Sequence, residues 1–225
     1  MIDVRVPTTR RGLLRRASLT GASMAGIAVS LGGCGSLFRA ATSTPRLFTL
    51  TSAKDIGPGV NTQWQLVVEE PLASRAIDTD FIALMPSSTE VKYFDSARWA
   101  ERAPRMVQTL LVESFENSNR IVAVGRQAVG LRADFQLTSE LREFQAEYRD
   151  GLRSPPVIRV RLSAKMILQP QQIIVASQSF DREAQLDAND IDTIIRGFDS
   201  VLGATMKAVV EWALSQRNPN EGKLL

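Results

Sequence analysis

Short apolar runs separated by turn-forming residues recur along the chain from residue 45 onward. Residues 45–50 and 62–68 have the composition of strands, and a loop that contains Gly-Pro-Gly lies between them. Residues 81–85 and 90–94 are two further apolar runs on either side of a Pro-Ser-Ser turn, which is the pattern of a β-hairpin. The first part of this region is therefore predicted to be built from strands.

The first helical pattern follows this hairpin. Asp95 or Ser96 is expected to cap a turn through residues 97–100. Because proline is tolerated in the first turn of a helix and costly further inside, the helix is predicted from about Pro104 to Asn117. Its apolar residues recur at helical spacing and are expected to face the core: Val107, Leu110, Leu111 and Phe115.

The second half of the chain contains longer strand patterns. Residues 121–124 form a short strand candidate, and residues 135–144 alternate so that most apolar members fall on one side of a ribbon. Residues 156–168 and 173–180 predict two more long strands, joined by a hairpin turn at 169–172. The charged residues in and just after the 135–144 strand are expected to form its solvated face: Glu140, Arg142, Glu143, Glu147 and Arg149.

A long helix is predicted to close the chain. Asn189 is expected to cap it, and it should end near Ser215. Its broad apolar face comprises Ile191, Ile194, Ile195, Phe198, Val201, Leu202, Met206, Val209 and Trp212. Asp187, Asp190 and Asp192 lie near its start, where carboxylates favour the positive end of the helix dipole. Their spacing lacks the glycine and terminal glutamate of a calcium loop, so no metal site is predicted.

These elements favour an α+β fold. We expect a mainly antiparallel sheet with two principal helices packed on one face, forming a single domain after a signal peptide. Residues 46–216 would form this domain, which is long enough for one substantial core. Residues 217–225 would be a polar tail.

The first 33 residues have the composition of an export signal. Five arginines precede an uncharged stretch at 17–33, which contains four glycines and is too weakly apolar for a permanent membrane helix. Arg10 and Arg11, followed by one variable residue, two leucines and a base, resemble the twin-arginine consensus. Residues 1–33 are therefore predicted to be a signal peptide of the twin-arginine type.

Cys34, the chain's single cysteine, follows Leu-Gly-Gly. This sequence resembles the lipobox of bacterial lipoproteins, in which the cysteine sulfur receives a diacylglycerol and the peptide bond before it is cleaved. Cleavage is expected between Gly33 and Cys34, which leaves residues 34–45 as a lipidated tether with no cofactor other than the covalent lipid. Since Gly35 is not the aspartate that retains lipoproteins in the inner membrane, the outer membrane is the predicted destination.

Charge and composition exclude several function classes. Residues 1–34 hold five of the 27 Lys+Arg and one of the 24 Asp+Glu, leaving 22 basic against 23 acidic residues, a net charge of −1. The mature chain therefore lacks the basic excess of a nucleic-acid-binding protein. The sequence has no histidine, which excludes Ser-His-Asp and Cys-His catalysis, and it has no Walker motif. No enzymatic activity is predicted.

Two segments carry a resemblance to a known family. Residues 48–50 read Phe-Thr-Leu near the mature start, and residues 91–101 contain Tyr, four variable residues and then Arg-Trp-Ala-Glu. With the lipobox and the closing helix, they make the chain similar to the ABC-type transport auxiliary lipoprotein family, which includes PqiC-like intermembrane transport lipoproteins. The resemblance covers about residues 46–214. The strand at 81–85 lacks the tyrosine and arginine of a close PqiC-like match.

The resemblance implies a role in transport. Family membership implies an outer-membrane lipoprotein on the periplasmic side, working with an ABC transporter and an MCE-type substrate-binding protein in moving lipids between membranes. Tyr93, Arg98 and Trp99 would be a docking cluster or a structural one. The alternative function is a periplasmic lipid- or solute-binding lipoprotein that is not tied to an ATPase, favoured by the apolar run at 81–85. Whether the protein forms a homo-oligomer stays open.

Overall fold

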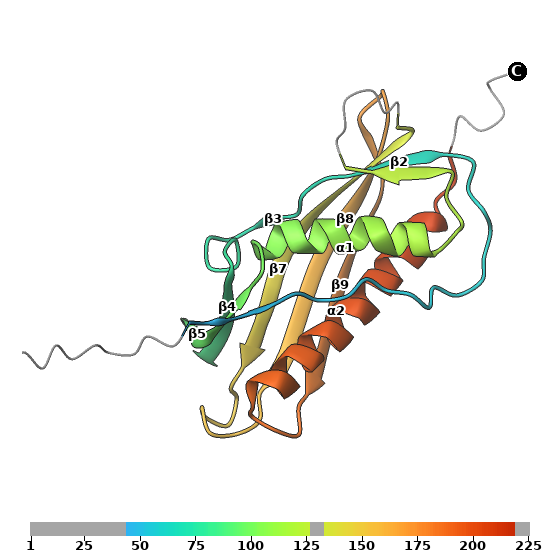
Figure 1. Cartoon of the computed structure of the whole chain (residues 1–225). Coiled ribbons are helices and arrows are strands. Elements are labelled where there is room, and N and C mark those ends of the chain that lie inside the picture. The colour runs from blue at the N-terminus through green and yellow to red at the C-terminus, as the bar shows by residue number, and fades with distance from the viewer. Residues whose placement is uncertain (1–43, 127–132, 219–225) are drawn as a thin grey trace, which may run out of the picture. The chain divides into compact units, whose positions relative to one another are not determined.

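The computed structural model describes residues 44–126 and 133–218, which form a sheet covered on one side by two helices (Figure 1). The helices are α1 (Ala103–Asn117) and α2 (Ile191–Leu214). The strands are β1 (Arg46–Phe48), β2 (Gln65–Val68), β3 (Leu72–Ala73), β4 (Phe81–Ser87), β5 (Glu90–Trp99), β6 (Ala123–Gly125), β7 (Phe135–Glu147), β8 (Val157–Leu168) and β9 (Ile173–Gln185). The predicted α+β architecture with both helices on one face is confirmed.

The 13-residue strand β7 connects the two halves of the sheet. On one side it pairs with β8 in a long antiparallel ladder, and β8 pairs in turn with β9. On its other side β2, β3 and β4 dock one after another along its length, all parallel to it. The sheet is therefore mixed, although its longest ladders are antiparallel, as the hairpin patterns predicted.

The core lies between the sheet and the two helices. The ring centroid of Trp99 lies 5.5 Å from that of Phe144 and 5.3 Å from that of Phe198, and the Phe144 and Phe198 centroids are 5.1 Å apart. These three buried rings come from β5, β7 and α2. Each aromatic pair of this geometry contributes about 0.5–1.5 kcal/mol of stability beyond the burial of its apolar area. The three rings therefore stabilise the packing of β5, β7 and α2 against one another.

A β-bulge in β7 keeps its apolar side chains on the helix side. Leu141 pairs with Leu162, but the next pair is Glu143 with Arg161, so Arg142 is an extra residue in the ladder. Before the bulge the buried apolar positions are odd-numbered, as at Leu141, and after it they are even-numbered, as at Phe144. If Arg142 occupied a regular position in the ladder instead of the bulge, strict alternation would turn Phe144 toward solvent.

The chain after β1 runs as an extended segment alongside α1 and across α2 (Figure 1). The backbone N–H of Thr51 donates to the Asp199 carboxylate of α2, and that of Ala53 donates to the hydroxyl of Ser114 on α1. Further along, the Arg120 guanidinium donates to the carbonyl of Gly57. The polar loop predicted between the first two strands is therefore held against both helices.

Two local predictions were wrong. Asp95 and Ser96 do not cap a turn, because β5 continues to Trp99, where pairing with β1 and burial of the indole hold the chain extended. The cap of α2 is Asp190 and not Asn189: the Asp190 carboxylate accepts from the Thr193 N–H, while the Asn189 amide donates to the Leu152 carbonyl. The Asn189 side-chain oxygen also accepts from the Tyr148 hydroxyl.

Neither helix in the described part of the chain has the length and apolarity needed to cross a membrane.

The elements that were predicted with helical or alternating periodicity are all present, with boundaries moved by a few residues. The two-residue strand β3 was not predicted, since so short a run has no periodicity to detect.

The bulge predicts which single-residue deletions the domain tolerates. Deleting Arg142 should change the free energy of unfolding by less than about 2 kcal/mol, because Glu143 and Phe144 already occupy the register of a regular ladder. Deleting Thr138 should abolish cooperative unfolding, because it moves one part of β7 to the wrong face. Urea denaturation of residues 44–225, followed by tryptophan fluorescence, measures both. Equal destabilisation by the two deletions would contradict this account of β7.

Candidate functional site

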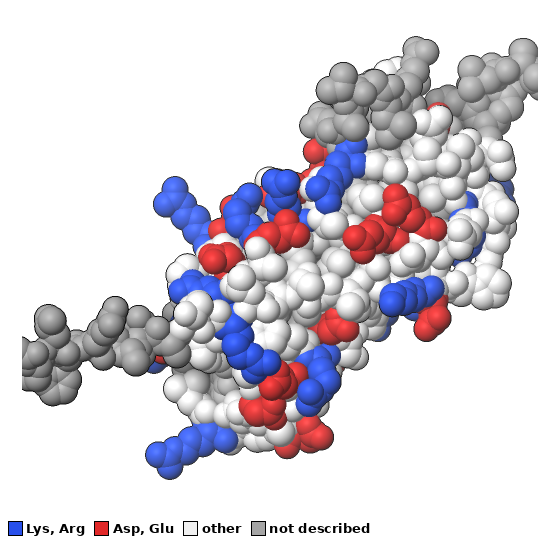
Figure 2. Space-filling model, in the orientation of Figure 1, with Lys and Arg blue, Asp and Glu red and all other residues white. Residues whose placement is uncertain are grey.

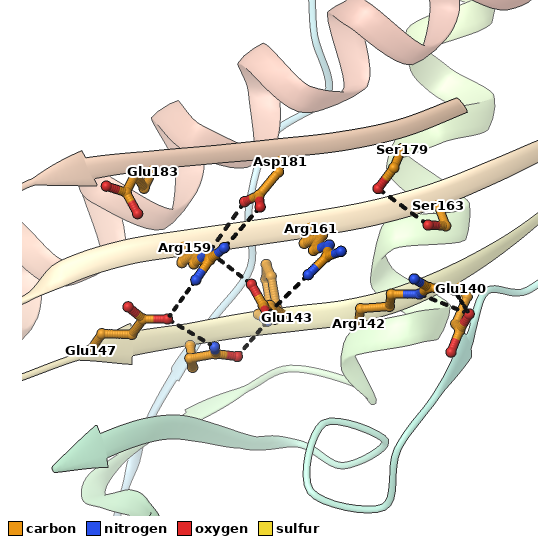
Figure 3. Close-up of polar contacts among 12 residues, drawn as sticks. Glu140, Arg142, Glu143, Glu147, Arg159, Arg161, Ser163, Ser179, Asp181 and Glu183 are labelled. Carbon is orange, nitrogen blue, oxygen red and sulfur yellow. Dashed lines mark hydrogen bonds and ion pairs between the residues drawn. The ribbon is translucent and has the colours of Figure 1, made fainter. Parts of the chain in front are cut away.

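The side of β7, β8 and β9 that faces away from the helices carries charged and hydroxyl side chains (Figure 3). We call this helix-free side the open face. No helix within the described ranges, 44–126 and 133–218, packs against it. Cross-strand pairing aligns its members in rows, with Arg159 opposite Glu183, Arg161 opposite Asp181, and Ser163 opposite Ser179. An ordered polar surface is therefore built on three long strands.

Arg159 is the centre of an ion network on this face. Its Nε lies 2.8 Å from Glu143 Oε2 on β7, and its Nη2 lies 2.8 Å from Asp181 Oδ2 on β9 (Figure 3). Its Nη1 lies 3.7 Å from Glu147 Oε1. Because the Arg159 side chain is 28% exposed and the Glu147 side chain 16%, these charges interact more strongly than fully solvated pairs would.

A second arginine extends the network to the end of the strands. Nη2 of Arg149 lies 2.8 Å from Glu147 Oε2 and 2.6 Å from Glu183 Oε2. Hydrogen bonds from Arg149 lower the pKa of Glu183, and those from Arg159 lower the pKa of Asp181. The same bonds raise the pKa values of the two arginines, so all four groups are charged at neutral pH.

A groove of about 550 Å³ lies where this network meets the β4–β5 hairpin. Its lining residues are Met85, Pro86, Ser87, Ser88, Glu143, Gln145, Glu147, Tyr148, Arg149 and Arg159. Four of them are charged, and their charges are paired with each other or with β9. A polar, paired lining of this kind suits contact with a polar surface better than the storage of an acyl chain.

The structure separates the three residues predicted as one cluster. Trp99 is 1% exposed and belongs to the core trio, whereas Arg98 points to the opposite side of β5. There the Arg98 guanidinium carbon lies 3.3 Å from the ring centroid of Phe81, and the ring of Tyr93 lies 5.1 Å from that of Phe81. The Tyr93 hydroxyl donates to the Ala76 carbonyl. Tyr93 and Arg98 therefore lie together at the surface, and Trp99 does not.

The remaining predicted site residues lie outside the described residues. These are Arg10 and Arg11 of the export signal, Gly33 at the cleavage site, and Cys34 as the lipidation site. Their roles stay predictions.

The predicted solvated face of β7 was only part of the observed surface. Arg159, Arg161, Asp181 and Glu183 complete it. The two arginines lie on the predicted strand 156–168, whereas Asp181 and Glu183 lie beyond residue 180, where the next strand was predicted to end. The available signal was the alternation of polar residues at 159, 161, 163 and 165 with apolar ones between them. Which carboxylate meets which arginine depends on the ladder registers, and these are long-range.

Charge on the helix side has no dominant sign. Figure 2 shows basic and acidic side chains interspersed over that side of the molecule.

In the part of the chain that the structure describes, no three or more carboxylates, histidines or cysteines converge as a metal site would require. What the open face offers chemically is a rigid array of paired charges and hydroxyls.

Comparison with known proteins identifies the family. A model of the ABC-type transport auxiliary lipoprotein component matches residues 48–210, which is most of the chain. The chain belongs to this family. The matched span contains all the described strands and helices from the end of β1 to most of α2.

Individual relatives agree with this assignment. A crystal structure of a Xanthomonas campestris protein of the DUF330 family is 28% identical, with a TM-score of 0.66 over 76% of this chain and 93% of that chain. Another crystal structure, of an uncharacterized protein, has a TM-score of 0.61 at 12% identity, covering 76% of this chain and 99% of that one. It shares the fold.

A curated relative is longer than this chain. An uncharacterized protein of Bradyrhizobium diazoefficiens is 25% identical over 204 residues, which is 90% of this chain and 52% of the relative. The chain thus spans about half the length of that protein.

The network predicts a pH-dependent loss of stability on substituting Arg159. At pH 7 we expect Arg159→Gln to cost about 1–2 kcal/mol, because it leaves partly buried carboxylates unpaired. Arg142→Gln is the matched control: Arg142 pairs only with Glu140 in the described structure, and we expect a cost of a few tenths of a kcal/mol.

The sign of the pH dependence follows from Asp181. Because Arg159 lowers the pKa of folded Asp181, the stabilisation is present above the unfolded pKa of about 4 and is lost as the pH falls through the lower folded value. Urea denaturation at pH 7 and pH 3 should show the Arg159→Gln difference shrinking at pH 3. A difference that is the same at both values would contradict an electrostatic origin.

Proposed function

We propose that this protein is an outer-membrane lipoprotein that faces the periplasm and serves as a docking component of an MCE-type ABC transport system that moves lipids between membranes. The observation that carries the proposal is the family match over residues 48–210. The leader supports it, because Cys34 follows a lipobox-like sequence and an apolar stretch too weak to anchor the chain by itself. Lipid on Cys34 would attach the domain through several acyl chains, which makes attachment effectively permanent.

The open face is the surface that suits docking. It is held by cross-strand ion pairs centred on Arg159, so a partner would meet preformed geometry and little side-chain ordering would oppose binding. Its charges are of both signs, which favours a protein partner with a complementary pattern over a nucleic acid. We therefore assign the contact with the transport partner to β7, β8 and β9.

The geometry gives less support to the alternative of a cargo-binding lipoprotein. Of the apolar run 81–85 that motivated it, Ile82 and Leu84 are buried in the core, whereas Phe81 is exposed and Met85 lines the groove. The groove beside them is lined largely by charged and polar residues, including Glu147 and Arg149. A lipid tail would have to desolvate those groups without offering them hydrogen bonds, which is costly.

Replacement of Cys34 tests the anchor and the partnership together. In the wild type we expect a triacylated Cys34 at the mature N-terminus, outer-membrane fractionation, and crosslinks to subunits of an ABC transport system. Cys34→Ala should remove the lipid and reduce the membrane-bound fraction at least tenfold. Mass analysis of the N-terminus and identification of crosslinked chains measure these outcomes. An unmodified soluble wild-type protein would overturn the proposal.

The export route has its own control. Changing both Arg10 and Arg11 to lysine should block lipidation by preventing export through the twin-arginine route, while leaving the lipobox intact. Unchanged lipidation in this variant would place the protein on the general secretory route and leave the anchor itself unaffected.

A further inference from the structure

Three elements at one corner of the sheet present a small exposed apolar surface. Leu47 on β1 pairs with Arg98 on β5, and Arg98 pairs with Phe81 on β4, so the three side chains form a row on one side of the sheet. Tyr93 and Val91 lie beside this row. We call these five residues the corner patch. Leu47 is 68% exposed, Val91 42% and Phe81 37%, which is unusual for apolar residues so close together.

The patch lies beside the point where the chain leaves the domain toward Cys34. The described structure begins at residue 44, only three residues before Leu47. Residues 34–43 are ten in number, and a chain spans at most about 3.3–3.6 Å per residue. Whatever their conformation, they keep residue 44 within about 35 Å of an acylated Cys34. If Cys34 is acylated as proposed, the corner patch is within reach of the membrane that holds the anchor.

Its chemistry matches that of a membrane interface. Tyrosine and other aromatic residues concentrate at the level of lipid headgroups, where one end of the side chain is apolar and the other is hydrated. Arg98 lies over the ring of Phe81, so its guanidinium can reach headgroup phosphates while the apolar atoms contact acyl chains. Lys92 borders the same hollow and adds a cation, although Asp95 borders it too.

A second exposed apolar pair lies at the other end of the sheet and gives a natural comparison. Ile173 and Ile174 are 56% and 53% exposed at the start of β9. They pair with the end of β8, and that end pairs with Phe135 at the start of β7. Strand β4 pairs with the opposite end of β7, at residues 145–147. Since Ala83 pairs with Gln145, Phe81 lies level with about residue 143; at about 3.3 Å per residue, the two exposed apolar sites are separated by roughly 26 Å along the strands.

We propose that the corner patch rests on the surface of the membrane that holds the lipid anchor, with Phe81, Leu47 and Val91 entering the interface and Arg98 binding headgroup phosphate. This inference rests on the proposed function, because it requires acylation of Cys34. The tether confines the patch near the bilayer at a high effective concentration, so a weak contact is enough to orient the domain. Ser163 on β8 and Ser179 on β9 lie two and three strands beyond β4 in the sheet, so we expect them to lie farther from the bilayer than the patch.

Site-specific fluorescence quenching tests this orientation. Acylation blocks the sulfur of Cys34, the chain's single cysteine, so one introduced cysteine can be labelled selectively. Ser96→Cys places a fluorophore next to the patch, and Ser179→Cys places it on the open face. Both serines are exposed. In vesicles of phosphatidylethanolamine and phosphatidylglycerol containing headgroup-nitroxide lipid, the full lipidated protein should show at least threefold stronger quenching at Ser96 than at Ser179.

Matched substitutions identify the cause of the difference. Replacing Phe81 and Arg98 together by serine should reduce quenching at Ser96 to the Ser179 level, whereas replacing Ile173 and Ile174 by serine should leave it unchanged. Equal quenching at both labels, in protein that floats with the vesicles, would overturn the patch proposal and leave the anchor intact. That face would then be open to a protein partner. Protein that does not float would overturn the anchor, and the patch proposal with it.

Discussion

The β-bulge at Arg142 is the constraint on which the two sides of the sheet depend, because it keeps this residue out of the alternation of β7. It shifts the alternation of β7 by one position, so that Leu141 and Phe144 both face the helices although they are three residues apart. The same shift turns Glu143 and Glu147 to the open face, where they meet Arg159. One backbone irregularity thus completes the aromatic core and the ion network together.

The core and the open face have different roles: the core holds the helices on the sheet, and the open face presents a polar surface. The rings of Trp99, Phe144 and Phe198 join β5, β7 and α2, which fixes the helices on one side and leaves the other side free. On that free side, paired charges hold a polar surface in place without covering it (Figure 3). The docking role that we propose requires a stable surface for a partner more than it requires a pocket, and the open face is such a surface.

Periodicity was sufficient to predict the helices and long strands, because each carries many residues of one pattern. It could not predict β3, which has two residues, or the continuation of β5 past Asp95, which depends on pairing with β1. The sequence predicted Arg98 and Trp99 as members of one cluster, but whether adjacent residues serve the core or the surface is decided by the face each occupies. The carboxylate partners of Arg159 depend on two ladder registers that no local pattern encodes.

The central claim is that the open face meets the transport partner. A photocrosslinking amino acid at Ser179, on the open face, and another at Glu113, exposed on α1, would be compared in cells that carry the lipidated protein. The account predicts that Ser179 crosslinks to subunits of an ABC transport system and that Glu113 does so at least fivefold less. Crosslinks from Glu113 alone would show that the partner binds the helix side and would contradict the account.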